Sequence, residues 1–193
     1  TIVNGQARLA PHGVGGSVES GTPAQAISSW VAQGAAWIHV LDQDSVDGRE
    51  PNHHHIVSSG AHLQYSGVVN DAGSLALALA TGASRIVIDG TDLAWASAAV
   101  ADQGDRLAVG LDIRQPDVVD VAAQLQRAGA GRFVVSDRAE SHHWKRGDRH
   151  LLSEFCSDTN RPVMAWGGVS HLGDLHALHE LVPHGLDGIV IDD

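Results

Sequence analysis

The sequence lacks the features of a secreted or membrane protein. It has a single cysteine, Cys156, so it forms no internal disulfide, which fits a reducing cytoplasm. No apolar run reaches the length of a membrane span, and no stretch has the pattern of a signal peptide. These absences favour a cytoplasmic protein without a membrane partner.

Basic residues are also scarce. The chain has 12 Lys and Arg against 23 Asp and Glu, a formal net charge of −11. This balance argues against a nucleic-acid partner, because such proteins carry basic patches. The acidic excess favours solubility and, to a lesser extent, disfavours anionic ligands.

A metal-binding pattern is missing as well, although the chain has 13 histidines. The run His53-His54-His55 and the pair His142-His143 have no zinc-site spacing. Consecutive residues on a helix point in different directions and seldom share a metal. We therefore expect no metal site and interpret the triplet as a solvated helix start.

What the sequence does have is a regular alternation of short apolar runs and helical patterns. Of its 193 residues, 43% are apolar, which suits one domain with a sizeable core. The continuous apolar runs are typical of parallel strands covered by helices. We predict strands at residues 37–41, 63–65, 86–88, 107–111, 133–136, 163–166 and 188–191, and an Asn4-Gly5 turn between two short extended pieces near the start.

An internal repeat organises these elements. LQYSGVVNDAGSL, beginning at Leu63, corresponds to a segment one hundred residues later, with Gly67 matching Gly167 and Gly73 matching Gly173. Residues 34–42 match 129–137 and residues 85–89 match 188–192, in the same order. Such self-similarity indicates two similar halves. We predict an α/β fold, a (β/α)8 TIM barrel forming a single domain over 1–193 with half-repeats of about 1–104 and 105–193, in which most of strand one and the last helix are missing.

The active site of such a barrel lies at the carboxyl ends of its strands. Asp112 and Asp137 end neighbouring predicted strands, so their carboxylates are candidates for general acid and base. Asp42 is interpreted instead as a helix cap or a support for loop backbone. Trp144 and Trp166 lie near the same mouth and are candidates for stacking on a ligand. Gly167-Gly168 follows a strand and opens a helix, as in loops whose amides hold anions.

The chain resembles the phosphoribosyl isomerases of histidine biosynthesis, especially the bifunctional actinobacterial type that also serves tryptophan biosynthesis. The segments that carry this resemblance are GAAWIHVLDQD with Gly48 and Asn52, SGVVNDAGSLALALATGASRIVI, DRLAVGLDI, RFVVSD and GGVSHLGDLHAL. The resemblance implies a half-barrel duplication and an aldose-to-ketose rearrangement of a phosphoribosylamine, an anionic small molecule, without cofactor or metal.

The resemblance also implies roles for individual residues. The family acid at the end of strand six falls on Asp137, and the strand-five aspartate falls on Asp112. Phosphate contacts fall on Arg8, on Ser66 and Gly67, and on Gly167 and Gly168.

Several positions depart from the family pattern. The family's strand-one aspartate either lines up with Thr1 or falls before the start of this sequence, and Val68-Val69-Asn70 replaces Gly-Ile-Arg. Asp89-Gly90-Thr91 and Asp192-Asp193 occupy the places of two phosphate turns. Three functions stay open on this basis: a working isomerase, a diverged relative acting on another small molecule, and a catalytically silent barrel with a binding or assembly role.

Overall fold

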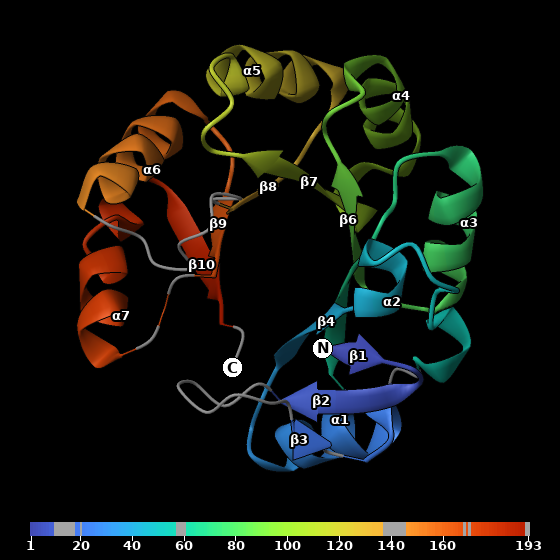
Figure 1. Cartoon of the computed structure of the whole chain (residues 1–193). Helices are drawn as coiled ribbons and strands as arrows, with labels where there is room; N and C mark the ends of the chain where they lie inside the picture. The colour runs from blue at the N-terminus through green and yellow to red at the C-terminus, as the bar shows by residue number, and fades with distance from the viewer. Residues whose placement is uncertain are drawn as a thin grey trace. The chain divides into compact units, whose positions relative to one another are not determined.

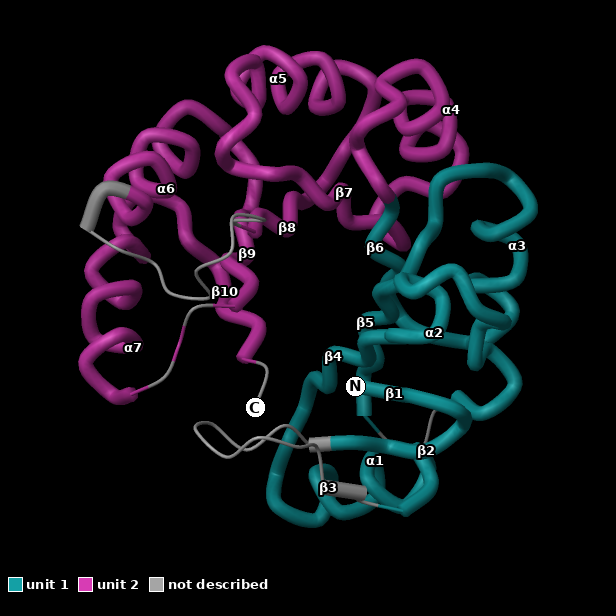
Figure 2. Tube along the Cα trace, viewed as in Figure 1, with its two compact units in different colours: residues 1–88, 193 teal, residues 89–192 magenta. Residues whose placement is uncertain are grey.

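The computed structural model describes residues 1–9, 18–19, 21–56, 61–136, 146–167, 169 and 171–191. The chain divides into two compact units, residues 1–88 and residues 89–192 (Figure 2). The boundary falls within strand β6 (Arg85–Asp89). We describe each unit by itself, and the predicted single domain with halves meeting near residue 104 stays a prediction.

The first unit begins with a small antiparallel sheet. β1 (Ile2–Val3) pairs with β2 (Gln6–Leu9), which pairs with β3 (Val18–Glu19). Asn4 and Gly5 have positive φ angles of 49° and 71°, the conformation that tight hairpin turns of this kind require. The predicted Asn-Gly turn is therefore confirmed. Ile2 also forms a parallel bridge with Asp42, so the short β1 doubles as a first parallel strand.

Three parallel strands follow in the first unit, β4 (Trp37–Leu41), β5 (His62–Ser66) and β6. They are accompanied by α1 (Pro23–Ala32), α2 (Gln43–Val46), the 3-10 helix η1 (His53–His55) and α3 (Ala72–Ala80). Thr22 caps α1 with Pro23 in its first turn, and Asp71 caps α3. The core of this unit includes the fully buried Leu63, Tyr65 and Ile86.

The second unit contains four parallel strands in chain order, β7 (Leu107–Asp112), β8 (Phe133–Ser136), β9 (Val163–Trp166) and β10 (Leu186–Val190). Its α-helices are α4 (Leu93–Gln103), α5 (Val118–Ala128), α6 (Arg146–Asp158) and α7 (Leu172–His179), and its 3-10 helices are η2 (Gly104–Arg106) and η3 (Val182–His184).

The helices α6 and α7 lie on one side of β9 and β10 (Figure 1). In the core between sheet and helices, Phe133 meets Phe155 edge to face with ring centroids 5.9 Å apart. Cys156 is buried there, and burial raises the pKa of its thiol to about 12. A thiol of this kind packs as an apolar group and is unreactive.

Parallel strands that alternate with helices throughout the chain make this an α/β fold of the TIM-barrel type, as predicted. Two local predictions were inexact. No helix was predicted at 43–46, where α2 stands, and the helix start expected at the histidine triplet is the 3-10 helix η1, after which residues 57–60 lie outside the described part. Within the described residues, no helix combines the length and apolarity of a membrane span.

Candidate active site

The strands of the second unit align four residues at their carboxyl ends. Asp112 pairs in register with Ser136, Ser136 with Trp166, and Trp166 with Val190. Residues opposite one another on neighbouring strands point to the same face of a sheet. A carboxylate, a hydroxyl, an indole and an aliphatic side chain therefore form one row, at the end of the strands where catalytic groups of this fold class lie.

Asp112 is held by the chain that follows it. Its Oδ1 accepts a hydrogen bond from the N–H of Arg114 at 3.0 Å. The guanidinium of Arg114 in turn pairs with Asp148, in the first turn of α6, whose side chain is only 5% exposed. Asp112 itself is half-buried. The structure thus supplies a half-buried carboxylate with a fixed backbone donor, a side chain of the kind that general acid–base chemistry uses.

Three of the predicted site residues lie outside the described residues. Asp137 is the next residue after Ser136, the last of β8; Trp144 lies between β8 and α6; and Gly168 follows Gly167. Their predicted roles, catalysis for Asp137, ring contact for Trp144 and phosphate binding for Gly168, stay predictions.

Gly167 forms the turn that follows β9. Its φ angle is +81°, a conformation that residues with a side chain rarely adopt. Its N–H donates to the carbonyl oxygen of Val190 at 3.1 Å, which extends the ladder between β9 and β10. Anion binding at this turn stays a prediction. Because the N–H of Gly167 already donates to Val190, the contribution of Gly167 would be the shape of the turn and not a hydrogen bond from its N–H.

Asp89, at the end of β6, is engaged in a local turn. Its Oδ1 accepts from the N–H of Thr91 at 2.8 Å and from the hydroxyl of the same residue. This side chain stabilises its own loop, and the carboxylate stands where the family resemblance implies a phosphate turn.

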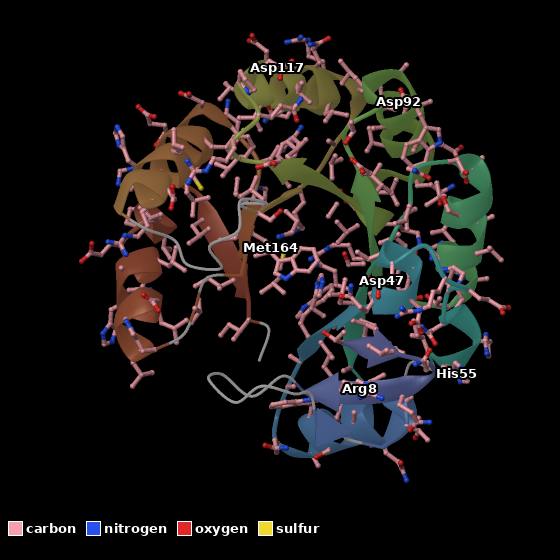
Figure 3. The ribbon with its side chains drawn as sticks, in the orientation of Figure 1. Arg8, Asp47, His55, Asp92, Asp117 and Met164 are labelled. Atoms are coloured by element: carbon pink, nitrogen blue, oxygen red, sulfur yellow. The ribbon has the colours of Figure 1, made fainter. Side chains whose placement is uncertain are left out.

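In the first unit, Arg8 lies on β2 (Figure 3). Its N–H donates to the carbonyl oxygen of Thr1 at 2.9 Å, and it pairs in register with Glu19 of β3. The antiparallel sheet therefore fixes the backbone from which the guanidinium extends.

Ser66 ends β5 and is buried, and the half-buried Gly67 follows it in a crowded place. The carbonyl oxygen of Ser66 accepts from the N–H of Asp42 at 2.8 Å. A Cβ on Gly67 would lie 2.8 Å from the hydroxyl of Tyr65 and 3.1 Å from that of Ser45. The hydroxyl of Ser45 also accepts from the N–H of Val68 at 2.8 Å. Close packing is thus one reason for the glycine, and the role of both residues in phosphate binding stays a prediction.

A buried polar network surrounds Asp42, which is fully buried. Its carboxylate caps α2 by accepting from the N–H of Ser45 at 3.2 Å and holds the following loop by accepting from the N–H of Asn52 at 2.6 Å. The interpretation of Asp42 as a cap and loop support is confirmed. The side-chain amide of Asn52 donates to Asp42 at 2.8 Å and to Asp44 at 2.7 Å, and its oxygen accepts from the N–H of Gly5 at 2.8 Å.

Asp44 is the second carboxylate of this network. Burial acts to raise its pKa, but hydrogen bonds from Asn52, Arg49 and the N–H of Asn4, with the charge of Arg49, outweigh burial and lower it. The lowered pKa favours the ionised form of Asp44, and its hydrogen bonds tie the Asn4-Gly5 turn to the end of β4. Sequence reasoning missed Asp44, although its place two residues after Asp42 at a strand end was a usable signal.

Tyr65 and His53 complete the network. The hydroxyl of Tyr65 donates to Asp42 at 3.1 Å and lies 3.0 Å from Nε2 of His53. Burial, followed by the charge of Asp42, raises the pKa of Tyr65, and burial lowers the pKa of His53. His53 is thus partly buried and hydrogen-bonded, which corrects the interpretation of the triplet as a solvated helix start for this residue, while His54 and His55 are exposed.

The described residues form no metal-binding group. Across the described ranges, no three His, Cys, Asp or Glu side chains gather closely enough to hold an ion. The acids that do lie close together, Asp42 and Asp44, are occupied by Asn52 and Arg49.

Comparison with known proteins gives a consistent result. The profile of the histidine biosynthesis protein family matches residues 2–192. A relative from Salinispora tropica is 38% identical over 210 aligned residues, covering 98% of this chain and 87% of the relative. It is named as the isomerase of an imidazole-4-carboxamide that carries a phosphoribosyl and a (phosphoribosylamino)methylideneamino group. A relative named phosphoribosyl isomerase A, from Streptomyces griseus, is 36% identical, and the alignment covers 98% of this chain and 87% of the relative.

Proposed function

The chain belongs to the histidine biosynthesis protein family, and from that premise we propose that it is an aldose–ketose isomerase of a phosphoribosylamine in histidine biosynthesis. The observation that carries the proposal is the placement of Asp112 at the end of β7, in register with Ser136 of β8. Ser136 directly precedes Asp137 in the sequence. Two acids, one at the end of β7 and one that follows β8 in the sequence, suit a reaction that consists of proton transfers.

The chemistry needs one acid and one base. An acid protonates the ring oxygen of the ribose as the C1–O bond breaks, and the amine nitrogen forms a C1=N bond. A base then removes the proton from C2, which gives an enolamine, and a proton added to C1 leaves a ketone at C2. We assign these transfers to Asp137 and Asp112. Because only protons move and no electrons enter or leave, the proposal includes no cofactor.

The substrate is proposed to be a phosphorylated small molecule, as the names of the relatives indicate for those proteins. Arg8, Ser66, Gly67, Gly167 and Gly168 are the proposed phosphate contacts. Arg8 contributes charge, while the glycines allow close approach to backbone. Activity in tryptophan biosynthesis and a cytoplasmic location are part of the proposal and follow from the family resemblance.

One observation favours a second candidate, a diverged enzyme for a less phosphorylated substrate. The carboxylate of Asp89 occupies the turn after β6 and is held there by Thr91. A phosphate oxygen about 4 Å from a carboxylate meets a repulsion of about 4 kcal/mol at an effective dielectric of 20. A substrate without a phosphate at this turn avoids that repulsion.

The experiment that tests the proposal is a direct assay of the purified chain. The doubly phosphorylated imidazole carboxamide substrate named for the relatives is offered beside an analogue that lacks one phosphate, and the ketose product is followed by NMR. Conversion of the first supports the isomerase, and conversion of the analogue alone supports the second candidate. Restored growth of a histidine-requiring strain is expected in parallel, and phosphoribosylanthranilate tests the tryptophan activity. No conversion of any substrate would refute the proposal.

A further inference from the structure

We infer that the indole of Trp166 is the surface on which the planar heterocycle of the substrate stacks, which makes Trp166 a specificity-determining residue. The inference rests on the proposed function and names the part of the substrate that this end of the sheet recognises.

The direction of the indole follows from the strand. Met164, two residues earlier on β9, extends from the side of β9 opposite to α6 and α7 (Figure 3). The alternate residues Val163 and Ala165 are fully buried. Trp166 shares the face of Met164 and is only partly buried. A large aromatic side chain thus stands at the carboxyl end of β9, on the face away from those helices.

The neighbouring row of the same face contains two glycines. In the next row along the strands, Gly110 aligns with Val134, Val134 with Met164, and Met164 with Gly188. Glycines at both ends of that row contribute no side chain. Met164 packs over Gly188, where its Cγ and Cε lie 3.6 Å from the position that a Cβ would take, so Met164 and Trp166 are the two large side chains that β9 presents on this face.

Asp112 lies at a suitable separation from the indole. Their strands, β7 and β9, are separated by β8, so their backbones are about 10 Å apart at about 4.8 Å per strand spacing. An imidazole ring on the indole and the adjoining sugar carbons fit within this span, with the sugar toward the carboxylate. The row then orders the substrate, with its heterocycle at β9 and its reacting carbons toward β7.

Stacking on an aromatic side chain predicts an effect on binding more than on the chemical step. We expect Trp166→Leu to raise KM for the imidazole carboxamide substrate by roughly 10-fold with kcat changed less than about 3-fold, since uniform binding is what is lost. Trp166→Phe keeps an aromatic face and should stay within about 3-fold of wild type. Trp95→Leu, on α4, is the matched control and should leave both constants unchanged.

Binding measurements separate this inference from the proposed function. The dissociation constants of 5-aminoimidazole-4-carboxamide ribonucleotide and of ribose 5-phosphate are measured by calorimetry for wild type and Trp166→Leu, with thermal unfolding as the check on folding. We expect Trp166→Leu to weaken the ribonucleotide by roughly 10-fold and ribose 5-phosphate by less than 2-fold. The inference would be overturned if Trp166→Leu weakened the binding of both ligands equally or of neither, or if wild type did not bind the ribonucleotide. A wild type that binds the ribonucleotide but does not turn over the isomerase substrate would refute only the proposed function.

Discussion

The side-chain amide of Asn52 donates a 2.8 Å hydrogen bond to the buried carboxylate of Asp42. The same amide group donates to Asp44, and its oxygen accepts from the N–H of Gly5. One side chain therefore supplies hydrogen-bond partners to two buried carboxylates and to the backbone of a hairpin turn in the first unit. Because unpartnered buried charges are costly, this residue is a larger determinant of stability than its size indicates.

Asn52→Ala is expected to reduce the free energy of unfolding by about 3 kcal/mol, since both carboxylates and the Gly5 N–H lose a partner. Urea denaturation measures the change. Asn70→Ala, at an exposed position of the same unit, is the control and should change stability by no more than about 0.5 kcal/mol. If the two variants unfold at the same urea concentration, the network does not stabilise the unit as argued.

Two glycines of the first half-repeat, Gly67 and Gly73, should respond to substitution by alanine in opposite ways. Gly67→Ala brings a Cβ within 2.8 Å of the Tyr65 hydroxyl, which must then move, and should cost about 1–3 kcal/mol. Gly73→Ala places its Cβ in the first turn of α3, at an ordinary 3.4 Å from Asp71, and should stabilise by up to about 1 kcal/mol. Thermal melts of the two variants test this, and a stabilised Gly67→Ala would contradict the packing described.

His39 makes stability depend on pH. Arg85 donates to the side-chain oxygen of Gln64, so the Gln64 amide nitrogen faces His39 and donates to its Nδ1 at 2.9 Å. Burial lowers the pKa of His39 to about 3, and the same cause lowers that of His53. In the unfolded chain both titrate near their usual value of about 6.5.

The unfolded chain therefore binds protons below about pH 6.5 that folded His39 does not bind until about pH 3, so stability should fall as pH falls through this window. His39→Gln removes one such group and should flatten the dependence measured by urea denaturation between pH 7 and pH 4. His179→Gln, exposed at the end of α7, is the control and should keep the wild-type slope. An unchanged pH dependence in His39→Gln would show that folding does not lower the pKa of His39.

Much of this architecture was predictable because the strands are continuous apolar runs and their boundaries are marked by charged residues or glycine. β7, β8 and β9 were predicted almost to the residue, with Asp112 at the end of β7. α2 was missed because four residues are too few to show a helical period.

The candidate site was less predictable than the strands. Residue identity alone indicated that Gly167 occupies a turn, which its positive φ angle confirms. It did not indicate that the Gly167 N–H donates to Val190, because that bond depends on the register of β9 against β10. The network around Asn52 likewise joins residues from four segments of the chain, so no local pattern predicts it.

The most direct test of the central claim, that strand-end aspartates transfer the protons, is the isomerisation rate of Asp112→Asn and Asp137→Asn. An amide can neither accept nor supply the proton, so kcat should fall by about 10²- to 10⁴-fold in each while the melting temperature stays close to that of wild type. Asp117→Asn, before α5 and without a side-chain capping bond, should match wild type. Wild-type rates in both Asp112→Asn and Asp137→Asn would contradict the account.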